Sequence, residues 1–155
     1  MAYDRPMSAC NHPSLEDLVS QAQARSGVSR AKLTEPRRQV LELLLHAEQP
    51  LRAYELLDRL SVERGSKVDP PTIYRALEFL VDIGLAHRLD SLNAYRACVH
   101  LDVKTTHVFL VCTVCSQVEE LPADGVSATL AALAAGALFK PLDVHIELRG
   151  RCKRC

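Results

Sequence analysis

The chain has 155 residues, 48% of them hydrophobic, which suffices for one domain of ordinary size or two small ones. Its 19 basic and 19 acidic side chains give a formal net charge of zero, so overall charge lends no support to nucleic-acid binding. No apolar run approaches the roughly 20 residues that cross a bilayer, and there is no Gly-rich phosphate loop, nucleophile elbow or paired acidic motif. The first ten residues lack the apolar core of a secretory signal. We therefore expect a cytoplasmic protein with reduced thiols that is not an enzyme and has neither membrane nor small-molecule partners.

The first part of the chain predicts four helices. Residues 14–25 form a short one, and Thr34 offers an N-cap for the next, whose apolar residues recur at helical spacing. Residues 53–60 form the third. The fourth begins at the proline pair 70–71, since proline can start a helix but not continue it, and ends at Gly84.

A β-hairpin follows these helices. Residues 85–89 and 94–98 alternate between apolar and polar side chains, with turn-forming residues between them. Three helices followed by a hairpin form a winged helix-turn-helix, whose last helix enters the DNA major groove while the wing touches the flanking backbone. Residues 25–38 hold five basic side chains and one acidic one, which indicates a basic patch. Spacing alone also allows a three-helix scaffold with a merely hydrated polar face.

The second part of the chain predicts a small α+β unit. Strands are expected at 108–111, 117–121 and 145–148, and a helix at 126–138 that Asp124 can cap. Such a small unit, with an apolar helix and open strand edges, would gain stability by pairing with a second copy. A homodimer is therefore expected.

Four cysteines stand in two pairs with identical gaps, Cys112-x-x-Cys115 and Cys152-x-x-Cys155. One tight turn aims both thiolates of a pair at one point, so two pairs supply the four soft ligands of a closed tetrahedral Zn²⁺ site. The pattern predicts structural zinc that ties the two ends of the second unit together. Disulfides and a redox dithiol are the alternatives.

A second group of metal-ligating residues lies near the junction of the two parts. It comprises His87 in the first hairpin strand, Cys98 at the end of the second, His107 before the next strand, and Glu120. One thiolate, two imidazoles and one carboxylate suit Zn²⁺ better than Fe²⁺, which favours nitrogen and oxygen.

Each of these assignments has an alternative. Cys98 could be a small buried hydrophobe, and His87 could lie near a phosphate. His100 competes with His107, because both follow Cys98. Glu119 competes with Glu120, and strand alternation places these two on opposite faces, so only one can turn toward the junction.

Several motifs together resemble the ferric uptake regulator family. They are Thr34-x-x-Arg37, Ala53-Tyr54-Glu55-Leu56-Leu57, Pro71-Thr72-Ile73-Tyr74-Arg75-Ala76-Leu77, the hairpin with Tyr95, and the two cysteine pairs in this order. The match covers roughly residues 15–155. The resemblance implies a cytoplasmic homodimer with a winged-helix DNA-binding domain over residues 1–97, a dimerisation and zinc-binding domain over 98–155, and a separate regulatory metal site.

The second ligand group is similar to that of the zinc uptake regulator branch. By the same resemblance, a member of the iron-sensing branch would carry a His-His-Asp-His run before the first cysteine pair. This chain has Thr105-Thr106-His107-Val108 at that place instead. The resemblance also implies DNA contacts by Arg37, Tyr54, Thr72, Tyr74 and Arg75, and a weaker third metal site using Asp143 or His145.

These implications predict a zinc-responsive repressor that binds an inverted-repeat operator in double-stranded DNA as a metal-loaded homodimer and controls zinc uptake genes. The alternatives are an iron- or peroxide-responsive repressor of the same family, or a zinc-ribbon interaction protein that does not bind DNA.

Overall fold

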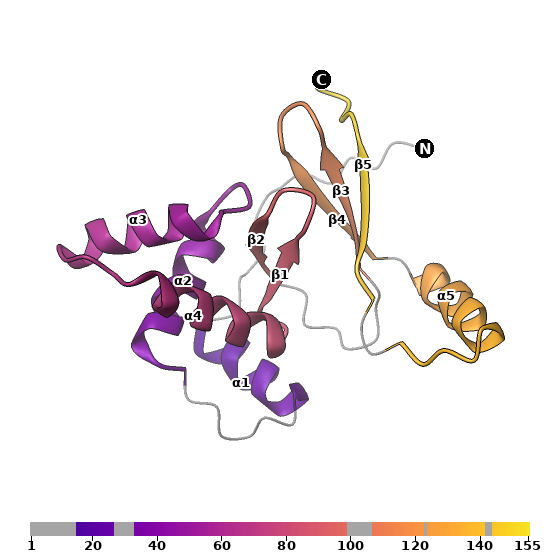
Figure 1. Cartoon of the computed structure of the whole chain (residues 1–155), viewed down its shortest axis with the longest axis horizontal. Helices are drawn as coiled ribbons and strands as arrows, with labels where there is room; N and C mark the ends of the chain where they lie inside the picture. The colour runs from indigo at the N-terminus through magenta and orange to yellow at the C-terminus, as the bar shows by residue number, and fades with distance from the viewer. Residues whose placement is uncertain (1–14, 27–32, 99–106, 123, 142–143) are drawn as a thin grey trace.

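The computed structural model describes residues 15–26, 33–98, 107–122, 124–141 and 144–155, and it confirms an α+β fold (Figure 1). The elements in chain order are α1 (Leu15–Ser26), α2 (Glu35–His46), α3 (Ala53–Arg64), α4 (Pro70–Asp82), β1 (Ala86–Leu89), β2 (Ala94–Ala97), β3 (His107–Cys112), β4 (Val118–Pro122), α5 (Asp124–Gly136) and β5 (Ile146–Gly150). Within the described ranges, no helix is both long and apolar enough to cross a membrane.

Helices α1 to α4 and the β1–β2 hairpin share one apolar core. The predicted apolar stripes of α2 and α4 are buried in it, with Leu41 and Leu80 fully inaccessible to solvent. Thr34 occupies the N-cap of α2 as predicted, although its side chain makes no capping hydrogen bond. Gly84 follows α4 with a φ of +74°, a left-handed conformation that glycine adopts without strain.

The main differences from the predicted helix bounds concern α3 and α5. Helix α3 continues one turn beyond residue 60 to Arg64 and ends at Gly65, which is left-handed, so the turn chemistry and not the end of the apolar stripe sets its length. Helix α5 begins at Asp124 itself, which is therefore its first residue and not the residue before it, and it ends two residues earlier than predicted.

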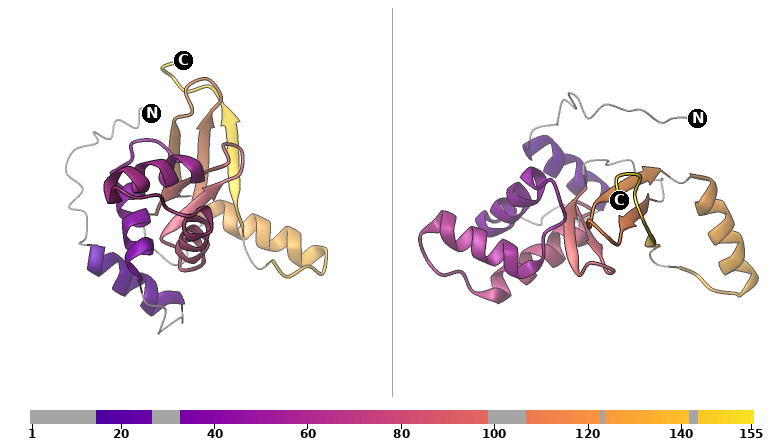
Figure 2. Two further views of the ribbon diagram at one scale, coloured as in Figure 1. Left: turned by 60° about the vertical axis from the view of Figure 1, so that its left-hand side comes forward. Right: turned by 90° about the horizontal axis from the view of Figure 1, so that it is seen from above.

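The strands form two sheets. β1 pairs with β2 in an antiparallel hairpin, and the second sheet has the order β4-β3-β5, with β4 antiparallel and β5 parallel to the central β3. Helix α5 lies in the connection between β4 and β5 and stands away from the sheet (Figures 1 and 2). Its Leu133 is 66% exposed, so the apolar helix is not covered within one chain.

A second, smaller apolar cluster joins the hairpin to the three-stranded sheet. It contains Leu89 from β1, Phe109 and Val111 from β3, and Val118 from β4, with Leu92 packed against it. Arg96 of β2 also donates a hydrogen bond to the carbonyl of Val118, at 2.9 Å. The hairpin therefore rests on the sheet by apolar and polar contacts together.

Candidate metal centres and nucleic-acid surface

The two cysteine pairs meet at one end of the three-stranded sheet. β3 ends at Cys112, and its register with β5 places Cys112 beside Gly150, two residues before Cys152. A tight turn follows each strand, closed by hydrogen bonds from the Ser116 amide to the Cys112 carbonyl and from the Cys155 amide to the Cys152 carbonyl. The parallel pairing of β3 and β5 thus brings together two motifs that are far apart in the sequence.

The four sulfur atoms fit a tetrahedral metal. All four lie within 4.8 Å of one another, with 3.8 Å between the Sγ atoms of Cys115 and Cys152 and 3.6 Å between those of Cys152 and Cys155. Zinc–sulfur bonds of about 2.3 Å in a tetrahedron imply sulfur separations of about 3.8 Å, whereas a disulfide requires about 2.05 Å. Cys112, Cys115, Cys152 and Cys155 all carry free thiols. The arrangement therefore fits a bound cation and not the disulfide alternative.

The electrostatics of these thiols also favour a cation. Backbone hydrogen bonds, the largest from Cys115, lower the pKa of Cys112 to about 6. A hydrogen bond from the backbone of Arg154 lowers the pKa of Cys152. Hydrogen bonding with Cys115 and Cys152 raises the pKa of Cys155 to about 12, since thiolates crowded together cannot all ionise. A divalent cation would remove this repulsion and let all four sulfurs act as thiolates.

The second predicted ligand group also converges in the structure. One ligand atom each from His87, Cys98 and Glu120 lies within 4.8 Å of the other two. The Nδ1 atom of His107 lies 2.7 Å from Oε1 of Glu120, and the rings of His87 and His107 have centroids 5.7 Å apart. The structure therefore brings the ligand atoms of His87, Cys98 and Glu120 together between the hairpin and the sheet, and His107 lies beside this group through its contact with Glu120.

The strand registers explain how these four residues meet. His87 lies near the base of the hairpin, and the Cys98 amide donates to the Leu85 carbonyl at 2.9 Å, which holds Cys98 beside that base. Glu120 pairs in register with Phe109 on the neighbouring strand, and the Phe109 ring lies 5.0 Å from that of His87. Two of the four residues thus belong to the hairpin and its end, and two belong to the sheet.

Alternation separates the two competing glutamates. The side chain of Glu120 is 9% exposed and faces the cluster, whereas Glu119 is exposed. Cys98 is buried, with 4% exposure, so its thiol lies in an environment that favours either a metal or an apolar neighbour. His100 and Asp143 lie outside the described residues, and His145 is exposed.

The residues predicted to contact DNA fall into two groups. Tyr74 and Arg75 are exposed near the N-terminus of α4, where Thr72 is half-buried, and Tyr54 is 56% exposed at the start of α3. Arg37 instead lies with its guanidinium 3.7 Å from the centre of the Phe79 ring, a cation–π contact that ties α2 to α4. This contact could not be predicted from the sequence, because nothing in the local pattern pairs residues 42 positions apart.

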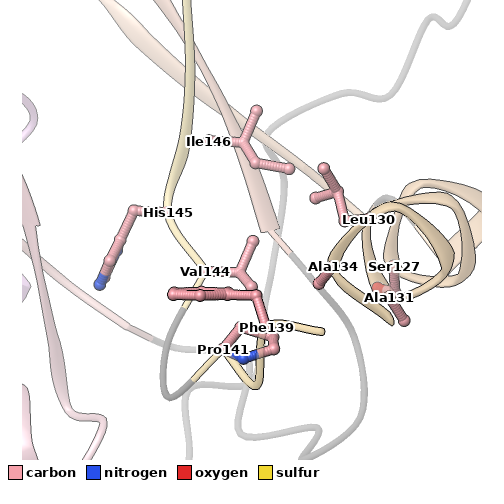
Figure 3. Close-up of a pocket in the computed structure, with 9 residues that line it drawn as sticks. All are labelled: Ser127, Leu130, Ala131, Ala134, Phe139, Pro141, Val144, His145 and Ile146. Carbon is pink, nitrogen blue, oxygen red and sulfur yellow. The ribbon is translucent and has the colours of Figure 1, made fainter. Parts of the chain in front are cut away.

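An apolar groove lies between α5 and the segment that leads into β5 (Figure 3). Leu130 and Ala134 line it from the helix, and Phe139, Val144 and Ile146 line it from the other side. Phe139 is 66% exposed and Leu138 is 98% exposed. Leu138 is the most exposed large apolar side chain among the described residues.

A winged helix-turn-helix joined to a sheet that carries two clusters of metal-ligating side chains defines a class of metal-dependent DNA-binding regulators. Comparison with known proteins agrees. The family model described as "Ferric uptake regulator family" matches residues 28–149, and the chain belongs to this family.

Several relatives are informative. The chain is 36% identical to the zinc uptake regulation protein of Escherichia coli K12 over 142 residues, which covers 90% of this chain and 82% of that protein. It is 29% identical to the ferric uptake regulation protein of Legionella pneumophila, covering 80% and 90%. Among solved structures it is similar to a zinc uptake regulator complexed with zinc and DNA, with a TM-score of 0.77 and 34% identity over 92% of this chain and 95% of that one. It is also similar to the crystal structure of holo XcZur, with a TM-score of 0.72 and 38% identity over 88% of this chain and 96% of that one.

Proposed function

We propose that this protein is a zinc-responsive transcriptional repressor, which binds an operator in double-stranded DNA as a metal-loaded homodimer in the cytoplasm and controls zinc uptake genes. Family membership supports a regulator and not an enzyme. The observation that carries the proposal is the convergence of His87, Cys98 and Glu120 from two separate parts of the fold, with His107 in contact with Glu120.

The donor set supports zinc as the sensed metal. The cluster offers one sulfur, two ring nitrogens and one carboxylate, which suits tetrahedral Zn²⁺, whereas an iron site would be richer in nitrogen and oxygen. We assign His87, Cys98, His107 and Glu120 to the regulatory site and the four paired cysteines to a structural site. Greater likeness to the zinc uptake regulation protein than to the ferric one points the same way.

The position of each ligand indicates how the two domains would share the regulatory metal ion. We assign residues 1–97 to the DNA-binding domain and 98–155 to the dimerisation and zinc-binding domain. Zn²⁺, when bound, would supply the positive charge that lets the Cys98 thiolate and the Glu120 carboxylate lie close together. His87 and Cys98 would hold the ion from the hairpin, and His107 and Glu120 would hold it from the three-stranded sheet. This fixes the angle of the winged helix relative to the dimer.

A fixed angle matters because a dimer must present both reading helices to successive major grooves at the spacing of an inverted repeat. Tyr54, Tyr74 and Arg75 are exposed and Thr72 is half-buried beside them; these four residues are assigned to the operator contact, with Arg37 as a phosphate anchor. Interactions made only in the closed form shift the population toward it, and about 1.4 kcal/mol of such preference gives a tenfold gain in DNA affinity.

The exposed apolar surface supports the homodimer. Leu133, Phe139 and Leu148 are each more than half exposed, and they lie on α5, after α5 and on β5. A second copy would cover this surface, which water otherwise solvates at a cost.

The test is a titration of operator binding by fluorescence anisotropy, using protein whose cysteine site is already loaded. Zinc at low free concentration should tighten binding, whereas Fe²⁺ or Mn²⁺ at the same free concentration should not. Tight binding without added metal, or a stronger response to Fe²⁺ than to Zn²⁺, would contradict the proposal.

A further inference from the structure

The tip of the β1–β2 hairpin is held by a residue that belongs to neither metal cluster. The carboxylate of Glu147 accepts hydrogen bonds from two successive backbone amides of the hairpin turn. Its Oε1 lies 2.7 Å from the Asp90 nitrogen, and its Oε2 lies 3.1 Å from the Ser91 nitrogen. Both oxygens are thus used on one turn, 56 and 57 residues away in the sequence.

The register of the sheet places this contact in line with the second metal cluster. Phe109 on the central strand pairs with Glu120 of β4 on one side and with Glu147 of β5 on the other. Residues in register on neighbouring strands point to the same face, so these three side chains form one row across the sheet. The hairpin lies against this row. Its base meets Glu120 and its tip meets Glu147.

We propose that Glu147 is a positioning residue for zinc-dependent DNA binding, which fixes the hairpin tip to the sheet so that the metal cluster at the hairpin base sets one orientation of the winged helix. This inference rests on the proposed function. A hairpin attached only at its base can pivot about that point, whereas attachment at base and tip leaves one orientation.

The chemistry of the contact suits this role. Hydrogen bonds to an ionised acceptor are about twice as strong as neutral ones, and two parallel bonds add directional precision. The Asp90 side chain also forms an ion pair with Arg88 of the same hairpin, at 2.9 Å. Glu147 lies on β5, which pairs with β3 and leads directly to the cysteine pair at Cys152. The strand that carries Glu147 is therefore held at both its side and its end.

The first experiment compares Glu147→Gln with the wild-type chain. The quantity measured is the ratio of operator affinities with and without zinc in the second cluster, the cysteine site being loaded in both. We expect this ratio to fall by about tenfold, within the range typical of coupling between linked sites, while the affinity without regulatory zinc rises only slightly and the zinc content stays unchanged. Asp82→Asn is the matched control, since it removes one exposed negative charge at the end of α4.

The direction of the change in operator affinity distinguishes the loss of the Glu147 hydrogen bonds from the loss of its negative charge. Removing an acidic charge from a DNA-binding protein should strengthen binding slightly, in the variant and the control alike. If the hydrogen bonds to Glu147 position the hairpin, the zinc-loaded protein should bind its operator more weakly in Glu147→Gln and not in Asp82→Asn. A variant ratio equal to that of the wild type would overturn the inference.

A second measurement needs no substitution. Hydrogen exchange of the Asp90 and Ser91 amides in the wild-type dimer should slow when zinc fills the second cluster, because both donors are then held by Glu147. Equally fast exchange with and without this zinc would overturn the inference. Absence of operator binding by the wild type would instead overturn the proposed function. The hydrogen-exchange comparison does not involve DNA, so it would still test the contact with Glu147.

Discussion

Leu89→Ala tests whether the contact between hairpin and sheet belongs to the DNA-binding form. Leu89 is completely buried, and its cluster partners Phe109, Val111 and Val118 all come from the three-stranded sheet. Truncating a buried leucine to alanine costs about 2–5 kcal/mol, and we take about 2–3 kcal/mol because a joint between two units can partly close the cavity. If the docked hairpin is the form that binds DNA, this cost corresponds to an affinity about 30- to 150-fold weaker.

The assay combines operator binding by fluorescence anisotropy, with and without zinc, with thermal unfolding followed by circular dichroism. Leu60→Ala is the matched control, since Leu60 is equally buried but lies in the core shared by the helices. We expect Leu89→Ala to lose zinc-dependent affinity with little change in the helical melting transition, and Leu60→Ala to do the opposite. A Leu89→Ala protein that keeps the wild-type zinc response and melts early like Leu60→Ala would refute the reasoning.

Three further predictions follow from the sites. Arg75→Ala should weaken operator binding by about 1–3 kcal/mol in a gel-shift assay and leave zinc content and dimer mass unchanged; wild-type affinity would exclude the DNA contact. Glu120→Gln should remove one zinc per chain by elemental analysis, whereas Glu119→Gln on the exposed face should not; the reverse result would exchange the two assignments. In metal-free protein, thiolate absorbance should show Cys112 ionised at neutral pH and titrating near its pKa of about 6. Because this pKa is depressed on folding, the stability that it contributes is complete above the unfolded thiol's pKa and is lost as pH falls toward 6; titration near the ordinary thiol value would contradict the assigned hydrogen bonds.

The fold could be predicted wherever local chemistry sets structure. Apolar stripes at helical spacing located α2 and α4, and the proline pair and Gly84 marked the ends of α4. Strand alternation also placed Glu119 and Glu120 on opposite faces. These features depend on residues a few positions apart, where backbone geometry decides which side chains share a face.

The long-range contacts could not be predicted in this way. Parallel pairing of β5 with β3 aligns the two cysteine motifs, and no local pattern reveals which strand β5 will join. The carboxylate of Glu147 bonds a turn 56 residues away, and the guanidinium of Arg37 lies on a ring from another helix. The exposure of α5 likewise depends on a surface that a second copy would supply. Such contacts are set by tertiary packing, which residue spacing alone does not encode.

The central claim is that metal at the joint between hairpin and sheet controls DNA binding separately from metal at the cysteine pairs. The most direct test measures zinc per chain by elemental analysis together with operator affinity, for the wild type and for Cys98→Ser. The two clusters predict two zinc ions per wild-type chain, with tight DNA binding only when both are present, and one zinc ion in Cys98→Ser with no zinc response. A Cys98→Ser protein that still binds two zinc ions per chain and responds to zinc as the wild type does would contradict the account.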